Sequence, residues 1–327
     1  MILHHLPDEF KEVVERARVA VDVEKISLPA RYGTAFHVRT PVEKAYELTG
    51  LFDQKGAHDF NDWEFLNEID RGRILSVIDD DPYLLWQVAR AEQLSAKVLV
   101  VPEGSYMNIS REVMGSDLCF VVVSEGARLT VDDVILNDAV AVRRLFVWQK
   151  EDSVFSFTGL RSGEMFLSER LQVFLEGARA RTEITHLCVG GGKSQLDIDV
   201  TTWHRGVNTK SDMGLRMSGG DKFSGVYKGC IDVDEKALGS QGYQSGKTLA
   251  LSRRAVMDIL PKLNIRTNQV KCSHGVTSSH VDDEALFYLR SRGLSLEVAR
   301  ELVIRSFFEA DMTLSPALLS ALDKALL

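Results

Sequence analysis

Two residues of this chain are well suited to metal or sulfur chemistry: Cys272 and His274, which lie two positions apart. If this segment is extended, both side chains leave the same face of the strand and can point at one iron, zinc or sulfur atom. A thiolate and an imidazole are ligands that such atoms accept. Two ligands do not complete a site, so further groups must join them.

The composition is that of an ordinary folded protein. The chain has 327 residues, of which 45% are hydrophobic and 26% charged, which allows a real core and gives no sign of disorder. A net charge of −8 argues against a nucleic-acid partner, because phosphate-binding surfaces need clustered Lys and Arg. No apolar run approaches the roughly 20 residues of a membrane helix, so we expect no membrane partner. The first ten residues lack the features of a signal peptide, which predicts a cytoplasmic protein.

The four cysteines are widely spread and never form a C-x-x-C pair. This spacing suggests neither a disulfide framework nor a zinc knuckle. Cys119 lies in an alternating segment and Cys230 follows Gly229, so we expect both to be buried thiols.

The hydrophobic pattern divides the chain into three regions. Residues 1–95 are mixed, with amphipathic helices predicted over 8–18 and 81–95. Residues 96–277 show a period of two, interrupted by short turns and by no helix, which fits a β-solenoid, a sandwich or a barrel. The tetrapeptide Glu-Gly-Ala-Arg recurs at 125 and 176, and we favour the solenoid. The clearest predicted strands are 97–101, 118–123, 154–157 and 171–175, and the predicted turns are 125–128, 161–164, 176–179 and 218–221.

Residues 278–327 form the third region, a small helical domain. Asp282 or Asp283 can cap a helix that ends near Gly293, and Ser295 can cap a second one that runs to about residue 309. Ser315, followed by proline, begins a third helix.

The segments 272–277 and 282–293 together resemble the carboxyl-terminal signature of the SufB/SufD family of iron–sulfur cluster assembly proteins, and the SufD branch in particular. Residues 227–233 and 241–252 are similar to the family's last β-helix rungs. The resemblance implies a mainly β fold, with a right-handed parallel β-helix core, a mixed amino-terminal region and a small helical domain. It also implies a cytoplasmic scaffold subunit without catalysis of its own.

The resemblance assigns partners and site residues. The chain would pair through its β-helix with a SufB-like chain or with itself, and Cys272 and His274 would hold a transient iron–sulfur cluster at the shared interface. A SufC-like ABC ATPase would bind the nucleotide and dock on the helical domain. Cys188 either lines a sulfur-transfer path or is a structural thiol, and burial is the favoured interpretation. The expected docking residues are Phe287, Tyr288, Arg290, Arg292, Phe307 and Phe308.

The chain departs from the SufB branch at two ligand positions. That branch has a cysteine near residues 252–255, where this chain has none, and a glutamate near the position of His274. The chain should therefore need a SufB-like partner to supply ligands, unless it forms a homodimer.

Two other motifs suggest different functions. Residues 190–194, Gly-Gly-Gly-Lys-Ser, resemble part of a phosphate-binding loop, but Leu187 stands where that loop needs its first glycine, so we predict a turn. Asp197 and Asp199 alternate on one strand, as carboxylates do in β-helix enzymes that cleave polysaccharides. A carbohydrate-active enzyme and a purely structural interaction protein are therefore the alternatives.

Overall fold

The computed structural model describes residues 68, 69, 73, 96–113, 117–136, 140–163, 166–310 and 313–326. The helices predicted over residues 8–18 and 81–95 lie outside these described residues, as does most of the predicted 1–95 region.

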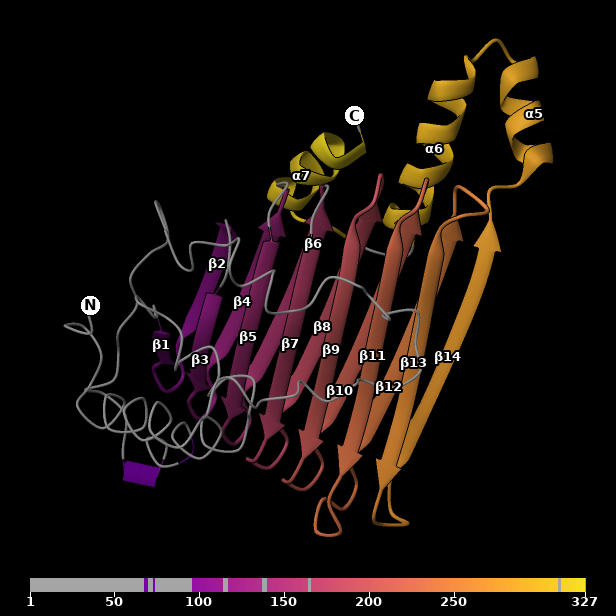
Figure 1. Ribbon diagram of the computed structural model, residues 1–327. Coiled ribbons are helices and arrows are strands. Elements are labelled where there is room, and N and C mark those ends of the chain that lie inside the picture. The colour runs from indigo at the N-terminus through magenta and orange to yellow at the C-terminus, as the bar shows by residue number, and fades with distance from the viewer. Residues whose placement is uncertain are drawn as a thin grey trace, which may run out of the picture.

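Two parallel seven-stranded sheets face each other and form a flattened solenoid (Figure 1). The chain alternates between the sheets, so each strand pairs with the strand two places later in the sequence. The odd sheet contains, in order, β1 (Ala96–Val101), β3 (Asp117–Val123), β5 (Val140–Gln149), β7 (Phe166–Leu175), β9 (Gln195–His204), β11 (Ser224–Val233) and β13 (Val256–Ile265). The even sheet contains β2 (Tyr106–Glu112), β4 (Arg128–Ile135), β6 (Val154–Ser162), β8 (Arg181–Gly190), β10 (Lys210–Gly219), β12 (Gln241–Ala250) and β14 (Lys271–His280).

This arrangement confirms the predicted mainly β fold and the preference for a parallel solenoid over a sandwich or barrel. The four strands predicted from the sequence all lie within observed strands. The β region extends three residues beyond the predicted boundary at 277, because β14 continues to His280.

A column of left-handed residues stacks where the chain passes from the odd sheet to the even sheet. Gly126, Asp152, Arg179 and Asn208 all have positive φ angles, between 54° and 63°. Their backbone N–H groups donate to carbonyl oxygens of the next turn along the solenoid, for example from Gly126 to Glu151 at 2.9 Å. These bonds satisfy backbone groups that the sheets leave unpaired.

The recurring Glu-Gly-Ala-Arg tetrapeptide lies in this column, but its two copies are out of register. Gly126 is left-handed in the first copy, whereas Arg179 is left-handed in the second. In the second copy, a Cβ at Gly177 would collide with the backbone of Glu151. The repeat agrees with a solenoid, yet it does not mark equivalent positions.

The space between the sheets is filled by one apolar core and by a buried ionic network. The core includes Phe155, Ile184, Met213 and Phe223, all shielded from solvent. The network joins Asp133 and Glu169 to three arginines, of which Arg161 donates two hydrogen bonds to Glu169 at 2.7 and 2.8 Å. Residues 161–164 were predicted as a turn; this is wrong for Arg161 and Ser162, because β6 continues through Ser162.

Three helices follow the strands: α5 (Asp283–Ser291), α6 (Leu296–Glu309) and α7 (Pro316–Leu326). The predicted caps are confirmed: Asp282, Ser295 and Ser315 accept hydrogen bonds from the first turns of α5, α6 and α7. Gly293 is left-handed, with φ 94°, as expected of a residue that ends a helix. No helix in these described segments has the length and apolar character needed to cross a membrane.

Helix α7 and the end of α6 pack on the outer surface of the even sheet. Their apolar side chains cover outward positions near the carboxyl ends of three strands, occupied by Val134, Leu160 and Leu187. Helices α5 and α6 form a hairpin that projects beyond the end of β14 (Figure 1).

Candidate functional site

Cys272 and His274 lie on β14, the last strand of the even sheet, as the sequence predicted for an extended segment. Cys272 pairs with Gly242 of β12, and His274 pairs with Gln244. Cys272 packs against the core, and a Cβ at Gly242 would lie 3.4 Å from its sulfur, so this row of residues faces the interior. The i, i+2 spacing therefore gives the thiol and the imidazole one shared face.

The thiol of Cys272 is half-buried. Burial raises its pKa above the ordinary value, and the backbone N–H of Gly242, which donates to the sulfur, opposes that shift only in part. The neutral thiol is therefore favoured in the isolated chain. A metal that binds this sulfur must displace the proton, which couples binding to pH.

The two side chains form only part of a ligand set. His274 is exposed to solvent, and the described residues contain no group of three or more His, Cys, Asp and Glu side chains that could hold a metal ion. The chemistry of the pair fits iron or zinc, because sulfur and imidazole nitrogen are their common ligands. The remaining ligands of such a site would have to come from another molecule.

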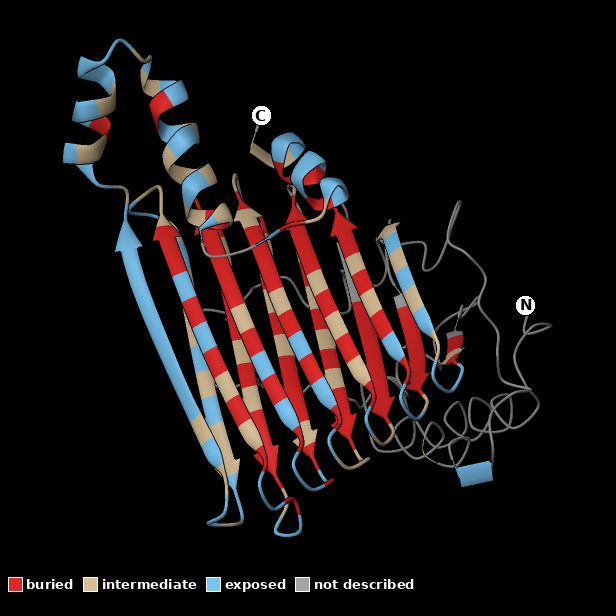
Figure 2. Ribbon diagram, turned by 180° about the vertical axis from the view of Figure 1, so that it is seen from behind, coloured by how far each residue is buried: buried red, intermediate tan, exposed pale blue. Residues whose placement is uncertain are grey.

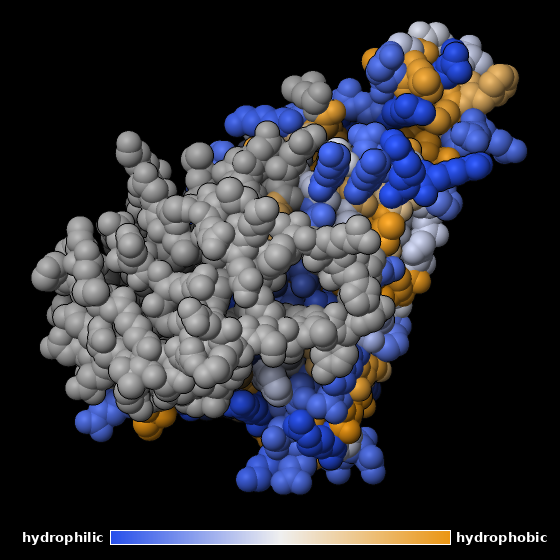
Figure 3. Space-filling model, viewed as in Figure 1, coloured by the Kyte–Doolittle hydropathy of each residue, from blue (hydrophilic) through white to orange (hydrophobic). Residues whose placement is uncertain are grey.

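The end of the solenoid that carries this pair is open. β13 and β14 each lack a strand partner on one edge among the residues described, and β14 is exposed along most of its length (Figure 2). Apolar side chains appear along this edge of the molecule (Figure 3). Val256, Leu260, Ile265 and Val276 are all more than a third exposed. An open edge with apolar side chains is a surface suited to pairing with another chain.

The predicted docking residues separate into two groups. Phe287 and Tyr288 on α5 are 74% and 57% exposed, and the guanidinium of Arg292 lies 5.3 Å from the Tyr288 ring centre. Phe308, in contrast, is fully buried in the cluster under α7, because it anchors α6 to the even sheet. Phe307 packs against the same cluster, and Arg216 donates to its carbonyl at 2.5 Å.

Cys188 lies deep in the interior with no exposed surface. Burial raises the pKa of its thiol to about 12, and the charge of nearby Arg161 offsets this only partly. A thiol with this pKa is almost entirely protonated at neutral pH, and only the thiolate is nucleophilic. These facts favour the interpretation of Cys188 as a structural thiol. Its role in a sulfur-transfer path stays a prediction.

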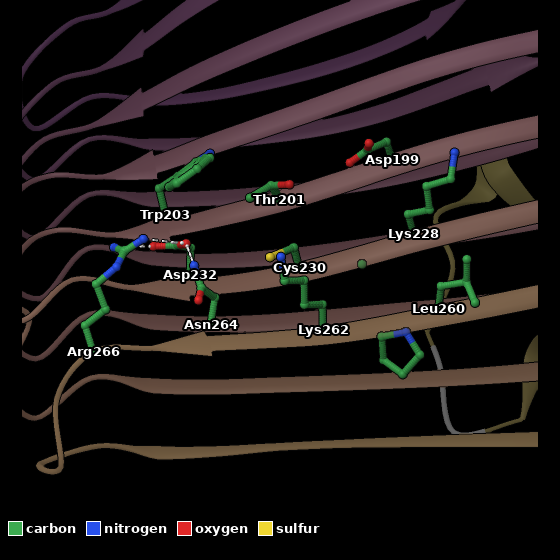
Figure 4. Close-up of a pocket in the computed structure, with 12 residues that line it drawn as sticks. Asp199, Thr201, Trp203, Lys228, Cys230, Asp232, Leu260, Lys262, Asn264 and Arg266 are labelled. Atoms are coloured by element: carbon green, nitrogen blue, oxygen red, sulfur yellow. Dashed lines mark hydrogen bonds and ion pairs between the residues drawn. The ribbon is translucent and has the colours of Figure 1, made fainter. Parts of the chain in front are cut away.

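The sequence did not reveal a groove of about 550 Å³ on the outer face of the odd sheet. Figure 4 shows Cys230 at its centre, between Thr201 of β9 and Lys262 of β13, which are its register partners. Burial raises the pKa of the Cys230 thiol, so the groove contains no activated nucleophile. Only the pairing of strands some 30 residues apart creates this surface.

One of the two carboxylates of the carbohydrate-enzyme hypothesis lies at this groove. Asp199 lines it, while Asp197 accepts a hydrogen bond from Lys228 Nζ at 2.7 Å. The turn predicted over 190–194 is confirmed for residues 191–194, while Gly190 ends β8. Gly192 is left-handed, Ser194 Oγ donates to the carbonyl of Gly191 at 2.6 Å, and a strand follows.

Known proteins share the sequence of the solenoid. A family described as "SUF system FeS cluster assembly, SufBD core domain" matches residues 88–307, which is more than half of the chain. The iron–sulfur cluster assembly protein SufD of Escherichia coli is 39% identical over 87 residues, 27% of this chain and 21% of that protein. Protein ABCI7, chloroplastic, of Arabidopsis thaliana is 28% identical over 224 residues, 64% of this chain and 46% of that protein.

An iron–sulfur cluster assembly SufBD family protein of Synechocystis is 26% identical over 171 residues, 52% of this chain and 38% of that protein. The chain thus spans less than half the length of each of these three relatives. The family match covers β1 to β14 and most of α6, and therefore includes Cys272, His274 and the open end. The chain belongs to the SufBD family of the SUF system, which functions in iron–sulfur cluster assembly.

Proposed function

We propose that this chain is a SufD-like scaffold subunit that pairs through the open end of its solenoid and contributes Cys272 and His274 to a shared, transient iron–sulfur cluster. One observation carries the proposal: the only C-x-H pair of the chain lies on the inner face of β14, where no further described strand covers the end of the solenoid. The cluster is cargo and not a resident cofactor, so the chain itself needs no catalytic residue.

Pairing at the open end would have two effects: it would bury apolar side chains and it would complete the set of ligands. The half-buried apolar residues Met257, Ile259 and Leu263 of β13 would lose their remaining solvent exposure, which favours association. The same contact would add ligands from a second chain to Cys272 and His274. A SufB-like chain and a second copy of this chain both fit that description.

The helical hairpin supplies a second contact. Phe287 and Tyr288 are exposed aromatic side chains next to Arg290 and Arg292, and aromatic and arginine residues dominate the energy of protein interfaces. We assign docking of a SufC-like ABC ATPase to this group on α5. We also propose that the chain and the ATPase assemble in the cytoplasm. Phe307 and Phe308 anchor the hairpin and make no direct contact in this proposal.

The first experiment is an anaerobic purification of the tagged full-length chain from its own cells. We expect an ATPase of the ABC type and, for a mixed pair, a SufB-like chain to accompany it. Recovery of the chain alone, without colour and without an ATPase, would contradict the scaffold proposal.

The ligand role has a separate test in cells that depend on the variant chain. Cys272→Ala and His274→Ala should each abolish maturation of iron–sulfur enzymes while the chain stays folded. Cys230→Ala is the matched control, since Cys230 is also half-buried but faces outward in the groove. If both ligand variants mature these enzymes normally, the shared-ligand assignment is wrong, even where the ATPase still co-purifies.

A further inference from the structure

Gln244 is a buried side chain whose polar atoms have no partner. It is 5% exposed, and neither its Oε1 nor its Nε2 makes a hydrogen bond within the described part of the chain. A buried amide without partners costs free energy, so most such groups in proteins are paired. The free energy that this unpaired amide costs would be offset in a state of the protein in which the amide has a partner.

The position of Gln244 connects it to the ligand pair. Gln244 is the register partner of His274, one strand further into the solenoid and on the same inward face. Neighbouring strands are about 4.8 Å apart, so the tip of a glutamine can reach the ring of a histidine on the next strand. In this inward row, Gln244 lies between Met213 of β10 and His274 of β14. Gln244 is thus the polar neighbour of His274 in the row, and the next residue, Met213, is apolar.

The opposite sheet leaves room for this amide. A Cβ at Gly229 of β11 would collide with Gln244 Nε2, so the carboxamide lies against the backbone of the odd sheet. The next residue in that row is Pro261, whose nitrogen carries no hydrogen and cannot donate to the amide. A partner for the amide can lie toward the open end, where His274 is its register partner.

We propose that Gln244 is a positioning residue for His274, an inference that rests on the proposed ligand role of Cys272 and His274. When one ring nitrogen of a histidine binds a metal, the other carries a proton and usually donates it to an oxygen acceptor, which fixes the ring. Gln244 Oε1 supplies that acceptor. The unpaired amide of the free chain becomes paired when His274 turns inward to bind iron.

The proposal predicts opposite effects of one substitution on stability and on metal affinity. Gln244→Met keeps the length of the side chain and removes the unpaired polar atoms, so the thermal midpoint of the free chain should rise by a few degrees. Loss of the acceptor should weaken cobalt(II) binding by about 10–100-fold. Gln244→Glu keeps an acceptor oxygen of the same reach and should bind cobalt(II) as tightly as the original chain.

The assay is a cobalt(II) titration of the full-length chain purified together with the chain that it pairs with, which supplies the remaining ligands. It is followed by the thiolate-to-cobalt absorption band, with thermal unfolding of each variant. Gln241→Met is the matched control: it lies on the same strand, on the outward face, and should change neither quantity. Cys272→Ala should remove the band. A band that survives Cys272→Ala, or is missing from the original chain, overturns the ligand site and this inference with it.

Other results overturn the role of Gln244 and leave the ligand site intact. Binding within twofold of the original chain for Gln244→Met would show that the amide serves no purpose toward His274. A fall in affinity that accompanies an equal loss of stability would show that the side chain acts only through folding. A fall that Gln244→Glu shares would show that an acceptor oxygen at this position is not what supports His274.

Discussion

The buried salt bridge between Arg161 and Glu169 should be essential to the stability of the solenoid. Arg161 is fully shielded and Glu169 is 4% exposed, and two hydrogen bonds of 2.7 and 2.8 Å join them. Burial alone would raise the pKa of Glu169, but the charge and hydrogen bonds of Arg161 outweigh it and hold that pKa well below its usual range. The ionised pair is therefore the folded form.

Glu169→Gln keeps the shape of the side chain and removes its charge, which leaves Arg161 without its main counterion. Removing one partner of a buried pair typically costs about 3–5 kcal/mol. Arg161 retains a contact with Asp133 Oδ1 at 2.9 Å, so we expect the lower end of this range, about 3 kcal/mol. A urea titration followed by circular dichroism measures this cost as a shift of the unfolding midpoint.

The control is the exposed ion pair of Arg179 and Glu151, whose 2.6 Å contact is as short as that of the buried pair. Both side chains are about half exposed, so Glu151→Gln should leave the midpoint unchanged within error. Arg161→Met combined with Glu169→Leu should cost less than the two single changes added together, because no charge is then left unpaired. A cost below about 1 kcal/mol for Glu169→Gln would refute the view that burial makes this pair important.

Three further predictions concern His204 and two phenylalanines of the helical domain. Burial lowers the pKa of His204 to about 4, below the ordinary 6.5, so the folded state resists protonation and stability should fall by roughly 3 kcal/mol as the pH drops from 6.5 to 4. His204→Gln should flatten this part of the stability curve in urea titrations; an unchanged slope would show that other groups cause it. Phe308→Ala should cost about 3–5 kcal/mol, because the ring is fully buried under α7. Phe287→Ala should leave the unfolding midpoint unchanged but weaken capture of the ATPase in a pull-down assay, and a loss of stability there would contradict its assignment to docking.

The sequence predicts local features of this fold well, because they depend on neighbouring residues. The caps at Asp282, Ser295 and Ser315 follow from residue type next to an apolar period, and the shared face of Cys272 and His274 follows from the geometry of one strand. These predictions need no knowledge of which strands lie side by side.

Features that depend on how separate segments pack together could not be predicted from the sequence. Arg161 resembles a turn residue next to Ser162 and Gly163, and only its contacts with Glu169 of the opposite sheet and Asp133 of the neighbouring strand explain why it is buried. Gly219 likewise resembles part of a turn, but it lies in β10 and leaves space for the ring of Phe223, which a Cβ there would strike. The partners of Arg161 come from other strands, whereas Phe223 lies in the turn between β10 and β11, so the close packing at Gly219 depends on how this turn folds back onto the strand.

The geometry of a solenoid explains why the proposed ligands, Cys272 and His274, are accessible only at its end. Each layer of strands covers the one before it, so an interior thiol such as Cys188 is sealed, with a pKa near 12 and no access for a metal. Only the last layer has inward residues with no further layer above them, and Cys272 and His274 occupy it. The same lack of a cover leaves apolar side chains of β13 half-buried, which favours association with a second chain. Under the proposed function, assembly of a cluster and association of two chains would be one event at this surface, and a change that blocks pairing at β14 should also abolish cluster binding by Cys272.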